Sequence, residues 1–223
     1  MNRFLAKQVP YYEQFYQMIK QMIFDGKYKP GERINETQLA KEFNVSKSPI
    51  REAVRILEKE GLLEVVNSKV VVYNPTLKDI KDIYYCRKAL ESFAVSQTTR
   101  IAADSEIEEI ENTLLETEKA IKDGKESKVI IELNEKFHNL ILQFTNNNRL
   151  QKQVNEIRGL IRYYRVLNFK GINRAEIILK QHRQIFHYMK RREDKLASEE
   201  MVKHLDLDIQ HLVEVLDSDL DKN

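Results

Sequence analysis

The most regular pattern of apolar and polar positions lies in residues 35–69, which predict a helix, a tight turn, a second helix and a short hairpin. In the second helix Ile50, Val54 and Leu57 fall on one face. The opposite face is a basic stripe of residues four apart, namely Lys47, Arg51, Arg55 and Lys59. Such a helix suits insertion into the major groove of DNA, although a solvated surface helix has the same pattern.

Turn and cap residues mark where these elements begin and end. Asn35 is a good N-cap for the first helix, and Asn44 can close that helix in a left-handed conformation. Gly61 ends the second helix, and two runs rich in β-branched residues flank a hairpin tip at Asn67-Ser68. A helix-turn-helix followed by a hairpin predicts a winged helix-turn-helix domain.

The rest of the chain has the spacing of helices and contains no proline after Pro75. Two capping-box patterns, Thr76 with Asp79 and Ser105 with Glu108, open the first two helices. Six helices are expected, near residues 76–103, 105–123, 127–144, 148–169, 174–191 and 195–216. Helices of this length predict an antiparallel bundle, whose interior is a usual place for cofactor and metal sites.

Composition and charge agree with a division at Asn74-Pro75 into domains 1–75 and 76–223. The first domain has 12 basic and 9 acidic residues, a net charge of +3, whereas the remainder carries −1. The single Cys86 excludes an internal disulfide and agrees with a cytoplasmic location. No apolar run is long enough for a signal peptide or a membrane span, so no membrane partner is expected.

Three histidines of the predicted bundle stand at positions that could form a metal site. Asn134 and His138 share one face of a helix, while His182 and His204 lie on two other helices. Neutral imidazoles from separate helices can converge on one divalent metal ion, with Asn134 adding an oxygen ligand. For any one histidine alone, a place on the surface or a hydrogen bond in the core is the commoner role.

The N-terminal pattern resembles the GntR family of bacterial transcription regulators. The resemblance is carried by Gly26, Pro30-Gly31-Glu32-Arg33, Leu39-Ala40, Val45 through Ala53, Leu57 and Glu60-Gly61-Leu62. It implies a double-stranded DNA operator contacted by Thr37, Ser46, Lys47, Ser48, Arg51, Asn67 and Ser68. The chain departs from the family at three of these positions, because Lys47 and Thr37 replace arginines and Ser68 replaces a glycine.

The C-terminal part resembles the FCD domain of FadR-type regulators, in its six-helix, VanR-like form. The similarity lies in Glu135 through His138, Asn147 through Leu150, Gln181 through Ile185 and Met201 through Leu205. It implies a divalent ion such as zinc, nickel or manganese on His138, His182 and His204, with Asn134 where the family has Asp. It also implies that Arg87 points into the effector cavity; a surface arginine paired with Glu91 is the alternative.

The sequence therefore predicts a mainly α protein, with an N-terminal winged helix-turn-helix and a C-terminal all-helical FCD bundle. The resemblances imply a homodimeric repressor controlled by a small organic acid that binds at the metal. One alternative is a regulator with a purely structural metal or a metal-free pocket. The other is a three-histidine metal hydrolase, which is disfavoured because no segment supplies a clear nucleophile or oxyanion loop.

Overall fold

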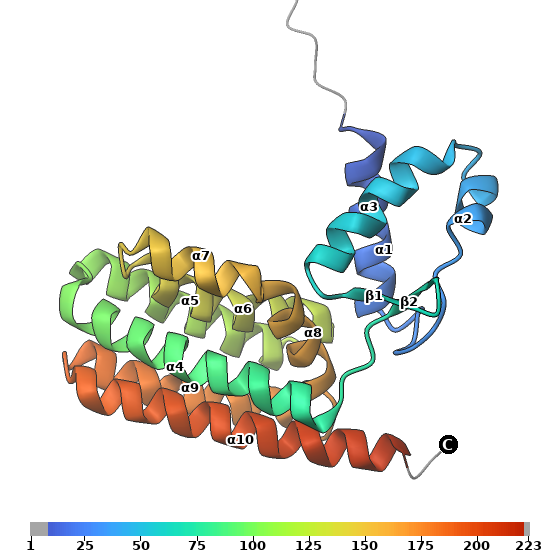
Figure 1. Ribbon diagram of the computed structural model, residues 1–223. Helices are drawn as coiled ribbons and strands as arrows, with labels where there is room; N and C mark the ends of the chain where they lie inside the picture. The colour runs from blue at the N-terminus through green and yellow to red at the C-terminus, as the bar shows by residue number, and fades with distance from the viewer. Residues whose placement is uncertain (1–8, 221–223) are drawn as a thin grey trace, which may run out of the picture. The chain divides into compact units, whose positions relative to one another are not determined.

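The computed structural model describes residues 9–220, with side chains described to residue 216. The chain forms two compact units that divide between Pro75 and Thr76. Both units are drawn in Figure 1, where the two strands lie in the first unit and the longest helices in the second. The expected fold class is confirmed, since the described residues are mostly helical with one small sheet.

The N-terminal unit is a winged helix-turn-helix. Its elements are α1 (Tyr11–Phe24), α2 (Glu36–Glu42), α3 (Lys47–Lys59), β1 (Leu63–Val66) and β2 (Lys69–Val72). The strands pair antiparallel, and the tip residues Asn67 and Ser68 both have left-handed φ angles, of 50° and 61°. That combination matches the right-handed twist of a tight hairpin. A bridge from Arg33 to Val71 attaches the segment before α2 to the hairpin.

The core of this unit lies between α1 and α3. Ile19 of α1 and Ile50 and Leu57 of α3 are fully buried, while the basic stripe on the other face of α3 is exposed. The predicted amphipathic pattern of α3 is thus confirmed. At the far end of the helix, Lys20 Nζ of α1 lies 2.7 Å from Glu60 Oε2, which joins the two helices at a partly exposed position.

The C-terminal unit is a helical bundle. Its helices are α4 (Leu77–Ile101), α5 (Asp104–Lys122), α6 (Ser127–Gln143), α7 (Asn148–Glu156), α8 (Arg158–Asn168), α9 (Arg174–Lys190) and α10 (Asp194–Leu220). Within the described part of the chain this makes seven helices, so the expected count of six was wrong. The fourth expected helix is interrupted at Ile157 (φ −105°, ψ 5°), whose amide bonds to Val154 three residues back instead of four.

The first residues of α4 and α5 can be compared with the two predicted capping boxes. The first is confirmed, because the Asp79 amide donates to Thr76 Oγ1 at 3.2 Å and the Thr76 amide donates to Asp79 Oδ2 at 3.0 Å. The second was wrong in position. Helix α5 begins at Asp104, where the carboxylate of Glu106 accepts from the amide of Ala103 at 2.8 Å.

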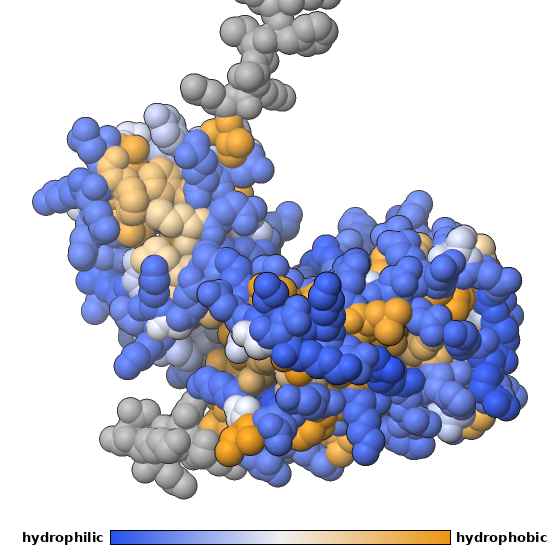
Figure 2. Space-filling model, turned by 180° about the vertical axis from the view of Figure 1, so that it is seen from behind, coloured by the Kyte–Doolittle hydropathy of each residue, from blue (hydrophilic) through white to orange (hydrophobic). Residues whose placement is uncertain are grey.

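The two longest helices of the bundle, α4 and α10, lie side by side, and α9 packs against α10 (Figure 1). The face of the molecule seen in Figure 2 is mostly hydrophilic with separate hydrophobic patches. The interior between these helices nevertheless holds many polar side chains, and these form the site described next. Between residues 9 and 220, no helix combines the length and the apolar character needed to cross a membrane.

Candidate metal centre and nucleic-acid interface

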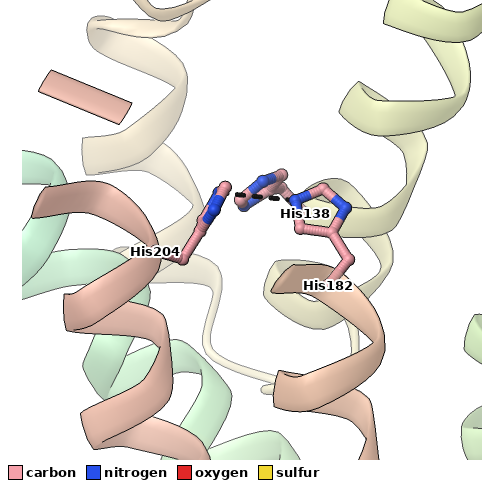
Figure 3. Close-up of side chains that lie close together, drawn as sticks. All are labelled: His138, His182 and His204. Atoms are coloured by element: carbon pink, nitrogen blue, oxygen red, sulfur yellow. Dashed lines mark hydrogen bonds between the residues drawn. The ribbon is translucent and has the colours of Figure 1, made fainter. Parts of the chain in front are cut away.

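Three histidines meet inside the bundle. His138 on α6, His182 on α9 and His204 on α10 turn their rings toward one another (Figure 3). One ring nitrogen from each lies within 4.8 Å of the others, and all three side chains are buried. Only the packing of three helices brings these residues together, since 22 positions or more separate His182 from the other two.

The spacing of the ring nitrogens fits a metal ion. The Nε2 atoms of His182 and His204 are 3.4 Å apart. Two nitrogens bound to one tetrahedral zinc at about 2.0–2.1 Å are also about 3.4 Å apart. The separations from the third nitrogen, which are at most 4.8 Å, need to shorten by up to about 1.4 Å to complete such a set, a change that side-chain rotation can supply.

Neighbouring side chains orient two of the rings. His204 Nδ1 lies 2.8 Å from Gln181 Oε1, so Nδ1 carries the proton and Nε2 presents its lone pair to the cluster. His138 Nδ1 lies 2.7 Å from Glu91 Oε2, a close contact that does not meet the geometry of a hydrogen bond, and Nε2 of that ring has no hydrogen-bond partner among the described residues. A carboxylate or amide oxygen behind a ligating histidine is the usual arrangement in metal sites.

Asn134 lies one turn before His138 on α6, on the same face, and is buried. Its Oδ1 has no hydrogen-bond partner among the residues that the structure describes. An unsatisfied buried acceptor costs about 1–3 kcal/mol of folding free energy, so its retention indicates a ligand. The oxygen of Asn134 thus fits the ligand set that the sequence predicts.

The three rings are held in the neutral form that binds metals. Burial lowers the pKa of His138 to about 3, and the positive charge of Arg165 adds to this effect. Burial also lowers the pKa of His182 well below its usual range, and that of His204 in the same direction. Neutral imidazoles avoid the proton competition that weakens metal binding in acid.

Charged side chains surround the histidines in the interior. Arg174 Nη2 lies 2.6 Å from Asp208 Oδ1, and Asp208 Oδ2 lies 3.7 Å from His204 Nε2. Arg165 Nη2 lies 3.9 Å from Glu91 Oε2, which also faces Arg87. With the buried carboxylate of Glu135, these groups amount to three arginines and three carboxylates, so the interior is close to neutral before any metal is added. A bound divalent ion on neutral ligands would make the site attract anions.

Arg87 of α4 is buried, with its side chain 0% exposed. Its Nε donates to Glu91 Oε1 at 2.7 Å, and its guanidinium stacks 4.7 Å from the ring centre of Tyr84. Although burial opposes its charge, the carboxylate of Glu91 raises the pKa of Arg87, so the group stays cationic. The alternative of a surface arginine was therefore wrong in location, even though the pairing with Glu91 is present.

The end of the Arg87 guanidinium has no protein partner. Neither Nη1 nor Nη2 makes a hydrogen bond to any residue in the described part of the chain. Two parallel N–H donors of this kind match the two oxygens of a carboxylate. The structure thus leaves paired guanidinium donors inside the bundle that suit a carboxylate.

One residue of the site, Asp208, was missed in the sequence. It follows His204 by one helical turn, the same spacing that links Asn134 and His138, and this repeat could have indicated it. Arg165 belongs to a run on α8, from Arg162 to Arg165, that the sequence offers only as weaker pocket candidates, because helical periodicity alone does not show which of them face inward. The structure buries Arg165, whereas Arg158 on the same helix is exposed.

The predicted DNA-contact residues share one property, which is exposure. They lie on α2, on α3, in the turn between these helices and at the hairpin tip. The exposed residues are Thr37, Ser46, Lys47, Ser48, Arg51, Asn67 and Ser68. Arg51 Nε lies 3.9 Å from Glu36 Oε2 of α2, so the arginine is loosely oriented by the preceding helix. The recognition role of these residues remains a prediction.

Comparison with known proteins agrees with both resemblances. Residues 11–71 match the model of bacterial regulatory proteins of the gntR family, and residues 82–207 match the FCD domain. The chain is 46% identical over 214 residues to the "Uncharacterized HTH-type transcriptional regulator YdhC" of Bacillus subtilis (strain 168), covering 96% of each protein. It is 23% identical over 197 residues to the "HTH-type transcriptional repressor RspR" of Escherichia coli (strain K12), covering 88% of this chain and 86% of that protein.

The fold is shared with solved structures. The structure of E. coli McbR/YncC superimposes with a TM-score of 0.75 at 20% sequence identity, covering 93% of this chain and 99% of that one. At this identity the likeness shows a common fold alone.

Proposed function

Since the chain belongs to the GntR family of bacterial regulatory proteins and carries an FCD domain, it is a transcription regulator, and we propose that it is a homodimeric repressor controlled by an organic acid. In this proposal the N-terminal unit binds double-stranded DNA and the C-terminal unit holds a divalent metal ion and the effector. The observation that carries it is the buried cluster of three neutral histidines beside an unpartnered asparagine oxygen.

We assign the metal to His138, His182 and His204, with Asn134 as an oxygen ligand; zinc, nickel and manganese all suit such donors. When bound, the ion supplies positive charge and open coordination positions for an anion. Gln181 keeps the proton of His204 on Nδ1, so the lone pair of Nε2 stays directed into the cluster. Because all four ligands are neutral, the ion's charge is left for the effector to neutralise.

The effector is expected to be an anion with a carboxylate. The proposed ion on neutral ligands supplies positive charge, and the Nη1 and Nη2 groups of Arg87, which make no hydrogen bond to the described residues, offer paired donors. A carboxylate there satisfies donors that are otherwise buried without partners, which lowers the free energy of the bound state. An organic acid thus gains from both the metal and Arg87.

DNA binding is assigned to the exposed face of α3, with Ser46, Lys47, Ser48 and Arg51 toward the groove and Thr37 beside them. We assign the hairpin tip, at Asn67 and Ser68, to contact with the DNA backbone beside that groove. Two such units, each reading half of a near-palindromic operator, require a dimer. The exposed apolar side chains of Tyr85 and Phe93 on α4 suit the bundle for contact with a second copy.

The effector acts on DNA binding only if it binds one arrangement of the protein more tightly than another. A regulator with a purely structural metal has the same histidine cluster but gains no stability from organic acids. The hydrolase alternative is disfavoured because both matched domains and the named relatives are transcription regulators.

The test combines metal analysis with thermal unfolding of two variants of α9. His182→Ala removes a proposed ligand, whereas His187→Ala changes an exposed histidine on the same helix outside the cluster. We expect the wild-type protein and His187→Ala to take up about one zinc, nickel or manganese ion per chain and to be stabilised by a carboxylic acid. His182→Ala should lose both properties together.

Absence of metal after purification without chelator, with no uptake of any of the three ions, would falsify the metal assignment. If chelation lowers the melting temperature but no carboxylic acid raises it, the metal is structural and the effector proposal fails. If acids stabilise the metal-free protein, the histidines line a metal-free pocket in which Arg87 is the anchor.

A further inference from the structure

We propose that the effector is a monocarboxylic acid with an apolar body, aliphatic or aromatic, and that this body occupies a chamber next to His138. The inference rests on the proposed function, because it specifies the class of acid that the same site takes. It excludes polyhydroxylated acids and acids with several carboxylates as the preferred ligands.

The chamber lies between α4, α6, α7, α8 and α10, and its lining is divided by polarity. One end is polar, where Glu91, His138 and Arg165 face the free space. The rest of the wall is hydrocarbon and thioether, contributed by Ala94, Ile141, Leu142, Val154, Ile161 and Met201. Asn139 and Arg158 are the remaining polar residues of the lining.

This lining distinguishes organic acids by the part of the molecule that lies beyond the carboxylate. Each hydroxyl of a sugar acid needs a hydrogen-bond partner after it leaves water, and a wall of aliphatic side chains supplies none. A hydrocarbon body needs no such partner and gains about a factor of four in affinity for each methylene buried. The chamber therefore favours an acid whose carboxylate lies at the polar end and whose body is apolar.

Charge limits the ligand to one carboxylate. The polar end offers Arg165 and His138, with the proposed metal behind it, but it also presents the carboxylate of Glu91. Glu91 lies 2.7 Å from Arg87 Nε and 3.9 Å from Arg165 Nη2, so one carboxylate already shares the cations at this end. A second ligand carboxylate would have to lie in the rest of the chamber, where the cation in the lining, Arg158, already lies 3.6 Å from Glu135 Oε1.

The wall that must move to admit such a body is the interrupted segment between α7 and α8. The free space at the centre of the chamber is about 20 Å³, enough for roughly one water molecule. Val154, Arg158 and Ile161 all line it and lie within four residues of the break at Ile157. A small rotation at a break in the hydrogen-bond ladder enlarges the chamber without unfolding either helix.

The experiment compares hexanoate with gluconate on the zinc-loaded full chain by titration calorimetry. The two acids share a six-carbon chain and one carboxylate and differ by five hydroxyl groups. We expect the dissociation constant of hexanoate to be lower by roughly 100-fold or more. Zinc content is measured on the same samples, and citrate is included as a multiply charged acid.

A variant locates the apolar body. Val154→Thr keeps the shape of the side chain but adds a hydroxyl to the chamber wall, and should weaken hexanoate binding by about tenfold. Val129→Thr makes the same change at an exposed position of α6 and should leave hexanoate binding unchanged. Both variants should retain zinc, which shows that the bundle is folded.

Tighter binding of gluconate or citrate than of hexanoate overturns this inference and leaves the proposed function standing. If no carboxylate binds the zinc-loaded protein, the proposed effector site and this inference both fail. If hexanoate binds equally to the wild-type protein and to Val154→Thr, it lies outside the chamber and the assignment is wrong. If Val154→Thr fails to fold, the comparison of hexanoate with gluconate on the wild-type protein decides whether the inference stands.

Discussion

Two ion pairs on α4 allow the cost of removing a counterion to be compared between a buried and an exposed position. Arg87 and Glu91 are four residues apart with a 2.7 Å contact, and their side chains are 0% and 10% exposed. Lys78 and Asp82 have the same spacing and order with a 2.5 Å contact, but their side chains are 82% and 60% exposed. Replacing each acid with its amide, Glu91→Gln and Asp82→Asn, removes one charge with little change in shape.

The expected costs differ by about an order of magnitude. In Glu91→Gln the guanidinium of Arg87 stays buried without a counterion, and Arg165, 3.9 Å from the same carboxylate, loses its partner too. Breaking a buried pair in this way costs about 3–5 kcal/mol of the free energy of unfolding. In Asp82→Asn water solvates the remaining lysine, so the cost should be about 0.5 kcal/mol or less.

The assay is urea unfolding of the metal-free protein at neutral pH, followed by circular dichroism. Because the two units can unfold separately, the transition of the N-terminal unit serves as an internal reference that neither substitution should move. The double variant Arg87→Met with Glu91→Gln should recover much of the loss, since it removes the uncompensated charge. Equal costs for the two single variants, or no recovery in the double variant, would refute the role assigned to burial.

Three further predictions concern acid, DNA and assembly. Burial lowers the pKa of all three clustered histidines, to about 3 for His138, so the unfolded state binds protons that the folded state does not. Stability of the metal-free protein should thus be full above about pH 6.5 and fall below it. The loss at pH 5.5 should be about 1.4 kcal/mol from His138 alone, with His182 and His204 adding to it, in urea titrations at the two pH values; no change would contradict neutral rings. Lys47→Ala or Arg51→Ala should weaken operator binding by about 1–3 kcal/mol in a mobility-shift assay without changing unfolding, whereas Lys125→Ala on the bundle should not. The full chain should sediment as a dimer at micromolar concentration and Phe93→Glu as a monomer; a monomeric wild-type chain would count against the proposed dimer.

The N-terminal unit was largely predictable because its signals are local. Ile50, Val54 and Leu57 repeat with the helical period, and their burial follows from that period once one face meets α1. The left-handed residues Asn44 and Asn67 occupy the turns where asparagine is tolerated. Such features depend on a few residues that are neighbours in the chain, so they can be predicted from the sequence alone.

The errors in the bundle arose where local signals compete. Ser105 with Glu108 is a good capping pattern, but Ala103 with Glu106 starts α5 two residues earlier. The helix breaks at Ile157, where the only local breaker nearby is Gly159, two residues further on; a single glycine inside a helical pattern does not by itself end a helix. Helix number was therefore decided by packing and not by sequence period.

The sequence by itself determined the histidine positions, and the family resemblance indicated that they share one site. Only the tertiary structure decided their surroundings, by burying Arg87 against Glu91 and placing Asp208 beside His204. The physical reason is that charge in a protein interior depends on which neighbours replace water, and these neighbours come from helices far apart in the chain. A helical period can show which face of a helix a residue occupies, but the neighbours of that face, and hence the pKa values and free donors of the site, exist only after the helices have packed.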